Sequence, residues 1–507
     1  MNAAARHRIE TPLAVAAGIV LTVLAYPPTW VPGLGLVMLA PIAWLLDGAR
    51  PRRAFLVAWL YSTAFAIWSC RFVVHALVVE YQVAELPSWF FLALVVLGVA
   101  LIPGLAGAAY AFLRPRGSGA AALVFAAVWT LGEWLRGTIA GVPWLLASQS
   151  VARWPLALQI ADLGGSYAVS FALLSVGGGI GIALRRRDAR VLAAPALVAA
   201  LWLGYGALRL ATFTEPAGPR WRVGIVQASV PQSERFRPDT AERNLARHEA
   251  ATRALVATGP LDLVVWSETA VDIDIDRHPQ VRARLERLAT ETQVPIVTGA
   301  PRSARGRLSN AVVLVMPERG LVESYDKQRL VPFSEYDPFF AGWLAALIGP
   351  VVEGPPYVAG AEATVFRAGA LPFATPVCFE ITYADLVRRF RLAGAELLVN
   401  LSNDAWFGRI GYPELHFAHA VLRAVETRTA VVRGANTGIS GVVDARGQVT
   451  RELAAFEEGT MRADVAPAGA LPLYARTGDA PLLGLLVAGL AVSALRERGG
   501  TQGRRLV

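Results

Sequence analysis

The chain has 507 residues and a formal net charge of +9, with 54% hydrophobic and only 17% charged residues. Soluble domains carry roughly 25% charged residues, so a fully soluble protein of this composition would expose large apolar patches. The positive charge does not indicate nucleic-acid binding, because much of it lies in short loops between apolar segments. The two cysteines, Cys70 and Cys378, lie in regions of different composition, which predicts neither a disulfide framework nor a thiolate zinc site.

The uneven distribution of apolar residues predicts three parts. We expect a transmembrane helical domain of about seven spans at 1–213, a soluble α/β domain at 221–467, and a last span with a short tail at 480–507. A spanning helix needs about 20 mostly apolar residues. The candidate spans are 12–26, 34–46, 54–74, 89–113, 121–144, 158–184, 191–213 and 481–495.

Arginine clusters occur after every second candidate span. They are Arg50, Arg52 and Arg53; Arg114 and Arg116; Arg185, Arg186, Arg187 and Arg190; and Arg496, Arg498, Arg504 and Arg505. The positive-inside rule then predicts that both termini are cytoplasmic. Seven crossings would place 221–467 on the outer side of the membrane, in a periplasm or its equivalent.

Charged residues within the spans are few. Glu133 and Arg136 are three apart and share a helix face, so they are either a structural ion pair or part of a polar cavity. We expect the Gly177–Gly179 run to permit close helix packing rather than to bind a ligand.

In the soluble part, short β-branched runs alternate with helical stretches. The predicted strands are 222–229, 261–266, 295–299, 311–316, 374–378 and 396–401, with late strands in 431–443. The predicted helices are 239–257, 278–292, 384–393 and 413–429. This alternation is typical of a layered α/β fold with a buried sheet.

Reactive side chains are concentrated in three segments. Glu268 comes directly after one strand, Lys327 and Glu335 lie in the segment 325–336, and Cys378 and Glu380 end another strand. Groups at the ends of neighbouring strands can converge in space. A carboxylate can take the thiol proton, the thiolate can attack a carbonyl, and the ammonium can stabilise the oxyanion.

Each of these residues also has a structural interpretation. A lone cysteine at a strand end is often a small buried apolar residue. Glu268 could cap the next segment, and Lys327 could be a solvated surface lysine. A catalytic role is favoured for Cys378, because a free thiol in an oxidising compartment is a liability unless it is used.

These residues resemble the nitrilase, or carbon–nitrogen hydrolase, superfamily, in which a Glu-Lys-Cys triad lies on an αββα sandwich. The whole chain is similar to the membrane-embedded apolipoprotein N-acyltransferase family. The matching motifs are Trp266-Ser-Glu268, Tyr325-Asp-Lys327, Cys378-Phe-Glu380, Glu133-Trp-Leu-Arg-Gly137, Val142-Pro-Trp144, Asp162-Leu-Gly-Gly165, Val226-Gln227 with Pro231-Gln232, Leu330-Val-Pro-Phe333 with Glu335-Tyr336, and Asn403-Asp-Ala-Trp-Phe-Gly408.

The resemblance implies a ping-pong acyl transfer in a bacterial inner membrane, with the catalytic domain on the periplasmic side. Cys378 would take a fatty acyl group from a phospholipid, typically phosphatidylethanolamine, as a thioester. The α-amino group of a diacylglyceryl-cysteine on an apolipoprotein would then accept it. Glu268 would be the general base and Lys327 the oxyanion donor, and no metal or other cofactor is implied.

The resemblance also implies supporting residues: Glu335, Glu380, Asn310, Phe379 and Trp406. Two positions depart from the family pattern. Phe379 replaces a common aromatic hydroxyl after the nucleophile, and Phe236 replaces a common tryptophan. We expect the apolar residues Phe339, Phe340, Trp343 and Leu344 to form either a lid at the membrane interface or a packed loop over the core.

Three other functions are compatible with parts of the sequence. A membrane-anchored nitrilase-type amidase would give the thioester to water, and a transporter or scaffold would have lost catalysis. A membrane domain that makes a glycolipid precursor would need an acidic metal motif, which the loops do not show.

Overall fold

The computed structural model describes residues 3–113, 115, 117–304, 306–336 and 356–503. The chain divides into two compact units. Unit 1 contains Met1–Arg71, Phe90–Phe213 and Arg476–Val507, and unit 2 contains Phe72–Trp89 and Thr214–Ala475. The sequence-based boundaries grouped 72–89 with the apolar N-terminal part, whereas this segment belongs to unit 2.

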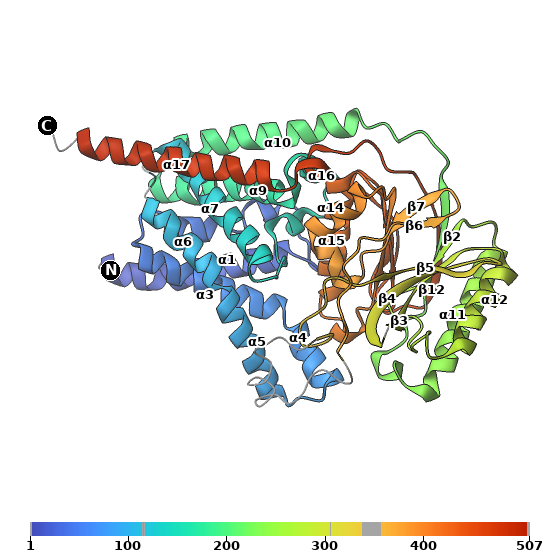
Figure 1. The fold of residues 1–507 in the computed structure, drawn as a ribbon. Coiled ribbons are helices and arrows are strands. Elements are labelled where there is room, and N and C mark those ends of the chain that lie inside the picture. Colours follow the sequence, from blue (N-terminus) through green and yellow to red (C-terminus); the bar gives the residue numbers. More distant parts are fainter. Residues whose placement is uncertain (1–2, 114, 116, 305, 337–355, 504–507) are drawn as a thin grey trace. The chain divides into compact units, whose positions relative to one another are not determined.

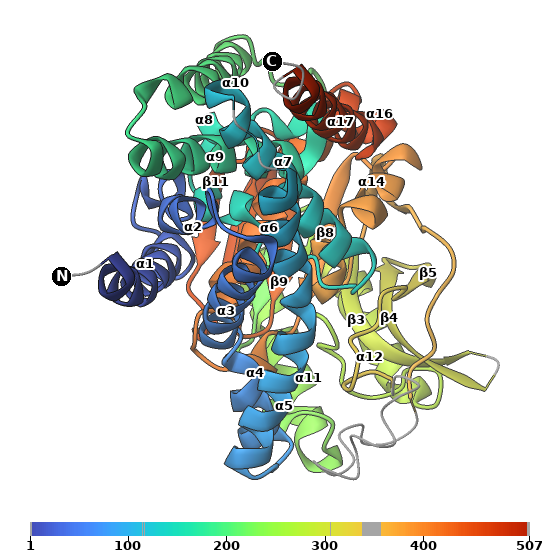
Figure 2. The ribbon, with the colours of Figure 1, turned by 90° about the vertical axis from the view of Figure 1, so that its left-hand side faces the viewer.

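Unit 1 is helical. Its helices are α1 (Ala3–Ala25), α2 (Ala40–Leu46), α3 (Pro51–Ser69), α5 (Glu85–Val99, shared with unit 2), α6 (Leu101–Leu113), α7 (Ser118–Thr138), α8 (Pro155–Leu158), α9 (Ala161–Arg186), α10 (Ala193–Ala211) and α17 (Ala480–Gly503), with 3₁₀ turns η1 (Leu34–Leu36), η3 (Ala147–Val151) and η4 (Ala189–Leu192). Helix α6 packs between α3 and α7 (Figure 2), and α9 packs against α2, α7 and α10.

Glycines on α9 allow this close packing. A Cβ at Gly178 would overlap the Phe125 ring, and one at Gly181 would overlap the Ala40 carbonyl. The same holds within the Gly177–Gly179 run, because a Cβ at Gly179 would meet Pro195. The expectation that these glycines serve helix packing therefore agrees with the structure.

Several helices that lie wholly or partly in unit 1 have the length and apolar composition of membrane spans. Four described segments qualify, Glu85–Leu113, Ala161–Arg186, Ala189–Ala211 and Ala480–Glu497, and a bent pair, Pro51–Ser69 with Phe72–Glu80, could be a fifth. Helix α9 is 78% buried over its most apolar window, against 22% for the α10 segment and 6% for α17. Helices α10 and α17 therefore expose apolar side chains that water would not tolerate. The count of eight spans and the topology stay predictions.

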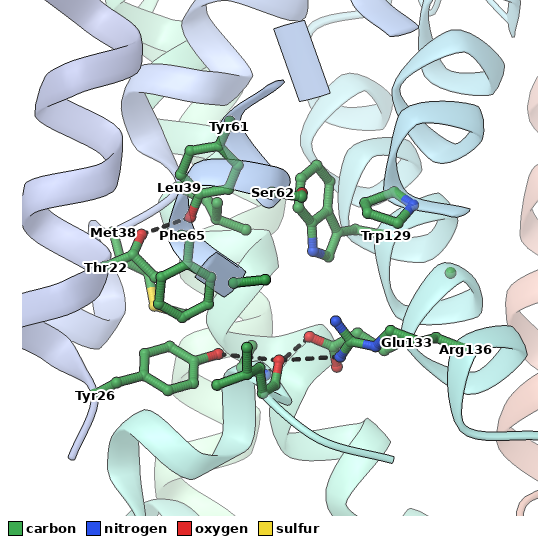
Figure 3. Close-up of a pocket in the computed structure, with 15 residues that line it drawn as sticks. Thr22, Tyr26, Met38, Leu39, Tyr61, Ser62, Phe65, Trp129, Glu133 and Arg136 are labelled. Carbon is green, nitrogen blue, oxygen red and sulfur yellow. Dashed lines mark hydrogen bonds between the residues drawn. The ribbon is translucent and has the colours of Figure 1, made fainter. Parts of the chain in front are cut away.

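Glu133 and Arg136 line a cavity of about 50 Å³ in unit 1, together with aromatic rings such as Tyr26 (Figure 3). The Oε1 atom of Glu133 accepts a hydrogen bond from the Ala147 backbone N–H (2.8 Å), and Arg136 Nη2 donates to the Leu145 carbonyl (3.0 Å). Both charged side chains thus support the loop that follows α7. The two side chains line the cavity and also interact electrostatically with each other, so both interpretations of the pair remain compatible with the structure.

The described residues of unit 2 form two six-stranded sheets. The first has the order β12-β1-β2-β3-β4-β5 and the second β11-β10-β9-β8-β7-β6. Strands β1 to β3 are parallel, as are β7 to β9, and the outer pairs are antiparallel. The strands are β1 (Trp221–Gln227), β2 (Leu263–Val265), β3 (Ile296–Ala304), β4 (Arg307–Met316), β5 (Gly320–Asp326), β6 (Phe366–Ala368), β7 (Leu371–Ala374), β8 (Leu397–Ser402), β9 (Val431–Ala435), β10 (Ser440–Val443), β11 (Val449–Leu453) and β12 (Gly459–Val465).

The two sheets pack against each other, with β1 against β9, and helices cover their outer faces (Figure 1). Helices α11 (Pro238–Ala257) and α12 (Pro279–Thr292) cover the first sheet, and α14 (Ala384–Leu392) and α15 (Tyr412–Thr427) lie on the second. The remaining elements are α4 (Phe72–His75), the π-helical turn η2 (Ala76–Glu80), η5 (Gln232–Glu234), η6 (Cys378–Thr382), η7 (Ala405–Phe407) and α16 (Leu473–Thr477). These layers confirm the predicted αββα sandwich.

One predicted strand is wrong in a way that matters for the site. The strand predicted at 374–378 is β7, which ends at Ala374. Pro376 cannot donate to a strand ladder, so regular pairing stops before it, and only an isolated bridge from Val377 to Leu401 follows. The chain turns at Cys378, which has a positive φ. Cys378 therefore lies in a tight turn beyond the strand end.

Candidate active site

Glu268 lies three residues beyond the end of β2 and is buried. Its Oε1 atom accepts hydrogen bonds from Lys327 Nζ (3.0 Å) and Asn310 Nδ2 (2.8 Å), and its Oε2 atom accepts one from the Asn403 backbone N–H (2.9 Å). Strand β3 can approach this turn closely because residue 299 is a glycine, where a Cβ would overlap the Glu268 backbone. Both sheets thus contribute to holding one carboxylate.

Lys327 follows the last residue of β5, and its side chain is 1% exposed. Its ammonium lies between two carboxylates, 3.0 Å from Glu268 Oε1 and 2.9 Å from Glu335 Oε2. Asn310 Nδ2 also donates to Glu335 Oε1 (2.6 Å), and the Val331 N–H donates to Glu335 Oε2 (2.7 Å). The sequence-predicted Glu268, Lys327, Glu335 and Asn310 therefore form one buried, hydrogen-bonded cluster.

The charges in this cluster set its protonation states. Burial raises the pKa of the Glu268 carboxyl, but the Lys327 charge and the hydrogen bonds from Lys327 and Asn310 outweigh it, so the net pKa is below its usual value. Burial lowers the pKa of Lys327, and the charges of Glu268 and Glu335 overcome that effect and raise it well above its usual value. Both groups are therefore ionised at neutral pH.

Cys378 is the first residue of η6, and its backbone φ of +50° lies in the left-handed region. A non-glycine residue pays of order 1–3 kcal/mol there and persists only where its surroundings hold it. Burial, followed by the charge of Glu268, raises the pKa of the Cys378 thiol far above its usual value, although Lys327 opposes the shift. The raised pKa keeps the sulfur protonated at rest, and the Glu268 carboxylate whose charge acts on it is ionised.

Glu380 links the loop after β5, which contains Lys327, to the turn that contains Cys378. It is fully buried and accepts hydrogen bonds from the backbone N–H groups of Val377 (2.7 Å), Gln328 (2.7 Å) and Arg329 (3.0 Å) and from the hydroxyl of Tyr325 (2.9 Å). Burial raises the pKa of Glu380 to about 6, against the effect of the hydrogen bonds from Val377 and Arg329. Its structural position is that of a brace between Lys327 and Cys378.

The aromatic residues singled out from the sequence have other contacts. The Phe379 ring lies edge-on to Tyr383, with centroids 5.3 Å apart. Trp406, in η7, stacks on Tyr81 at 5.3 Å and 16°. Phe236 is 44% exposed. The structure thus brings Trp406 to the segment Phe72–Trp89, and the proposed lid residues 339, 340, 343 and 344 lie outside the described residues.

A second polar network lies beside Cys378 and was missed from the sequence. Its members are all buried and come from β8, β9, α15 and the segment after β8: Asn400, Ser402, Asp404, His416 and Arg433. The available signal was an arginine within the apolar run Val431–Ala435 and an asparagine within Leu397–Ser402. Charged residues are seldom fully buried without a partner, so each implies a buried counterpart.

Two of these side chains could, together with Cys378, be mistaken for a metal site. The ligand atoms of Cys378, Asp404 and His416 lie within 4.8 Å of one another. However, Arg433 Nη2 donates to Asp404 Oδ2 (2.8 Å) and lies 3.1 Å from His416 Nδ1. The Arg433 guanidinium already faces the ligand atoms of Asp404 and His416, and its positive charge would repel a metal ion. This set of three side chains therefore does not fit a metal site.

Two family models match the chain. Residues 222–471 match the carbon–nitrogen hydrolase model, and residues 17–179 match the model of the apolipoprotein N-acyltransferase N-terminal domain. The first match covers nearly all of the αββα sandwich and contains every residue of the cluster described above.

Relatives match along most of the chain. An apolipoprotein N-acyltransferase of Azotobacter vinelandii is 33% identical over 503 residues, and one of Geobacter metallireducens is 30% identical over 506 residues. Each alignment covers 96% of this chain and 95% of the relative. Among solved structures, an amidase of the nitrilase superfamily from Nesterenkonia is 19% identical, with a TM-score of 0.40, and covers 53% of this chain and 98% of that chain.

Proposed function

This chain belongs to the apolipoprotein N-acyltransferase family, and we propose on that premise that it moves a fatty acyl group from a phospholipid to the α-amino group of a lipoprotein through a thioester on Cys378. The observation that supports this most strongly is the arrangement of the protonated Cys378 thiol, the ionised Glu268 and the buried Lys327 in one cluster. Amide hydrolysis, the alternative considered from the sequence, is not favoured by the family.

In the first half-reaction, Cys378 Sγ attacks the ester carbonyl carbon of the phospholipid and its proton passes to Glu268. The oxyanion that forms is stabilised by the Lys327 ammonium, which two carboxylates keep charged. The C–O bond then breaks, and the leaving glycerol oxygen takes the proton from Glu268. The products are a Cys378 thioester and a lysophospholipid.

In the second half-reaction, the α-amino group of the diacylglyceryl-cysteine attacks the thioester carbonyl. Glu268 takes a proton from the attacking nitrogen, Lys327 stabilises the second oxyanion, and the C–S bond breaks. The Cys378 sulfur leaves as a thiolate and recovers its proton from Glu268. All protons balance through one carboxyl group, and Lys327 stays protonated throughout.

The resting protonation states have a chemical consequence. Because the thiol pKa is raised and the Glu268 pKa is lowered, free thiolate is scarce until a carbonyl is in place. A protonated thiol is a poor target for oxidation. The cluster thereby protects a cysteine that works outside the reducing cytoplasm.

The protein is a membrane protein, as its family and apolar helices indicate. We place it in the bacterial inner membrane, with unit 2 on the periplasmic side and phosphatidylethanolamine as the acyl donor. The loop arginines and the lipid nature of both substrates support this orientation. A reporter fused near Gly218 should be active only on the outer side, and cytoplasmic activity would refute the orientation.

The proposed function is tested by an acyl-transfer assay. Purified protein is incubated with phosphatidylethanolamine and a diacylated lipopeptide, and the triacylated product is measured. Cys378→Ala should abolish transfer, whereas Cys70→Ala, which removes the other free cysteine, should retain it. Transfer by Cys378→Ala at the wild-type rate would refute the proposal. Release of free fatty acid without transfer would indicate a hydrolase.

A further inference from the structure

The carbonyl of Cys378 is held by two side chains. His416 Nε2 lies 3.0 Å from this oxygen, and Asn400 Nδ2 lies 3.4 Å from it. Asn400 also donates to the neighbouring Pro376 carbonyl (2.7 Å). Because Cys378 has a positive φ, its backbone needs such support to keep that conformation.

One buried guanidinium orients both donors. Arg433 Nη1 donates to Asn400 Oδ1, and Arg433 Nη2 donates to His416 Nδ1 (3.1 Å). Asp404 supplies the matching charge, with its Oδ2 2.8 Å from Arg433 Nη2, and Ser402 Oγ donates to Asp404 Oδ1 (2.7 Å). The charge of Arg433 is thus compensated within the network, and its N–H groups face fixed acceptors.

The partners of His416 determine where its ring proton lies. Nδ1 lies 3.1 Å from Arg433 Nη2, which is a donor, and 3.1 Å from Asp404 Oδ1, which is an acceptor. Nε2 faces the Cys378 carbonyl, which can only accept. The proton then sits on Nε2, which points at the Cys378 carbonyl and can only donate to it. Burial, then the charge of Arg433, lowers the pKa of His416, which agrees with a neutral ring.

We infer that His416 and Asn400, oriented by Arg433 and Asp404, are positioning residues that hold the Cys378 turn so that the sulfur faces Glu268 and an incoming carbonyl. This inference rests on the proposed role of Cys378 as nucleophile. It assigns His416 no part in proton transfer, although the ring lies close enough to the sulfur to suggest a Cys-His-Asp arrangement. In the neutral His416 ring the proton lies on Nε2, which donates it to the Cys378 carbonyl, so it is not available to the sulfur.

The expected effect of losing this support is on turnover. A misplacement of about 1 Å at a reacting atom can lower a rate on the order of 100-fold. Because the Cys378 carbonyl is already bonded to His416 and Asn400, we expect it to make no contact with the substrates and KM to change little. A merely structural role would instead lower the amount of folded protein and leave kcat per folded molecule intact.

Two amide substitutions separate these possibilities. In His416→Gln, the amide nitrogen overlaps the position of Nε2 and can still donate to the Cys378 carbonyl. In His416→Asn, the amide overlaps Nδ1 and cannot reach it. His248→Gln is the control, because His248 is buried in the same unit but bonds the Asn244 carbonyl within its own helix, α11.

We expect kcat for lipopeptide acylation to fall about 100-fold in His416→Asn, and less than about 10-fold in His416→Gln, with KM within about 3-fold of wild type in both. His248→Gln should keep wild-type kcat. Wild-type kcat in His416→Asn would overturn the inference, and so would a His416→Gln variant as inactive as Cys378→Ala, since that result would make His416 the general base.

Thermal unfolding of each variant shows whether it folds. If neither His416 variant folds, Asn400→Ala decides the same question by removing the weaker donor: a lower kcat at unchanged KM supports the inference and an unchanged kcat overturns it. Failure of the proposed function is recognised separately, because Cys378→Ala would then remain active. The His416 and Asn400 variants test the positioning inference by itself only when Cys378→Ala is inactive, that is, when the proposed function holds.

Discussion

At the scale of single residues, Lys327 is a positive charge that is buried almost completely, which is costly unless the charge is paired. Its ammonium is buried and shared by the carboxylates of Glu268 and Glu335. Such a charge is stable because each carboxylate compensates part of it, and the remaining oxygens are occupied by Asn310 and by backbone N–H groups. Removing any one member leaves the others uncompensated.

We therefore expect Lys327→Met to lower the free energy of unfolding by about 3–5 kcal/mol, because two buried carboxylates lose their counterion. Turnover should fall by about 100-fold or more, since the oxyanion loses its donor. Adding Glu335→Gln to this variant should recover part of the stability without recovering turnover. Thermal unfolding in detergent and the acyl-transfer assay measure the two effects. Near-normal turnover in Lys327→Met would show that another group binds the oxyanion.

At the scale of elements, the site depends on how Glu380 ties the turn η6 to the loop after β5. Its carboxylate accepts three backbone N–H groups from both segments. Protonation would turn one of the accepting oxygens into a donor and break part of this brace. The relative placement of Lys327 and Cys378 should therefore depend on the ionisation of Glu380.

The pKa of Glu380 is about 6 in the folded protein, above the value of 4.5 for an unperturbed glutamate. The folded state thus binds this proton more tightly, so ionised Glu380 costs stability above pH 6, and acidification from pH 6 towards 4.5 removes that cost. Turnover should nevertheless fall below about pH 6, because the brace is weakened. Glu380→Gln should be poorly active at all pH values and lack the step near pH 6. A step that persists in this variant would assign it to another group.

Much of the element order could be predicted from the sequence. The apolar runs of β1, β3 and β8 and the periodic helices α11, α12, α14 and α15 all lie close to their predicted positions. The edge strands β5, β6, β11 and β12 were not predicted. Strand β12 is recognisable only through its pairing with β1, more than 200 residues earlier, and local patterns do not contain such pairings.

The site was predicted to a similar degree. Glu268, Lys327 and Cys378 stand out in the sequence because they lie in motifs of a known superfamily. Arg433 and His416 did not, because their significance depends on side chains brought together from β8, β9 and α15. The turn at Cys378 was mistaken for strand, since a positive φ at a non-glycine residue leaves no signature in sequence.

At the scale of the whole molecule, the chain combines an apolar helical unit with a soluble αββα unit that contains the complete cluster of reactive groups. Helices α10 and α17 have the length and apolar composition of membrane spans, and they expose many apolar side chains. A protein with one membrane unit and one catalytic unit suits a reaction in which both the acyl donor and the acceptor are held by a membrane. Unit 2 supplies the chemistry and unit 1 keeps the protein where the lipids are.

The account as a whole depends on an acyl group that resides on Cys378 between two half-reactions. Its most direct test is intact-protein and peptide mass spectrometry after incubation with phosphatidylethanolamine and no acceptor. We predict one fatty acyl group on Cys378, absent in Cys378→Ser, present in Cys70→Ser, and discharged when a diacylated lipopeptide is added. An unmodified Cys378 in a preparation that still acylates the lipopeptide would contradict the account.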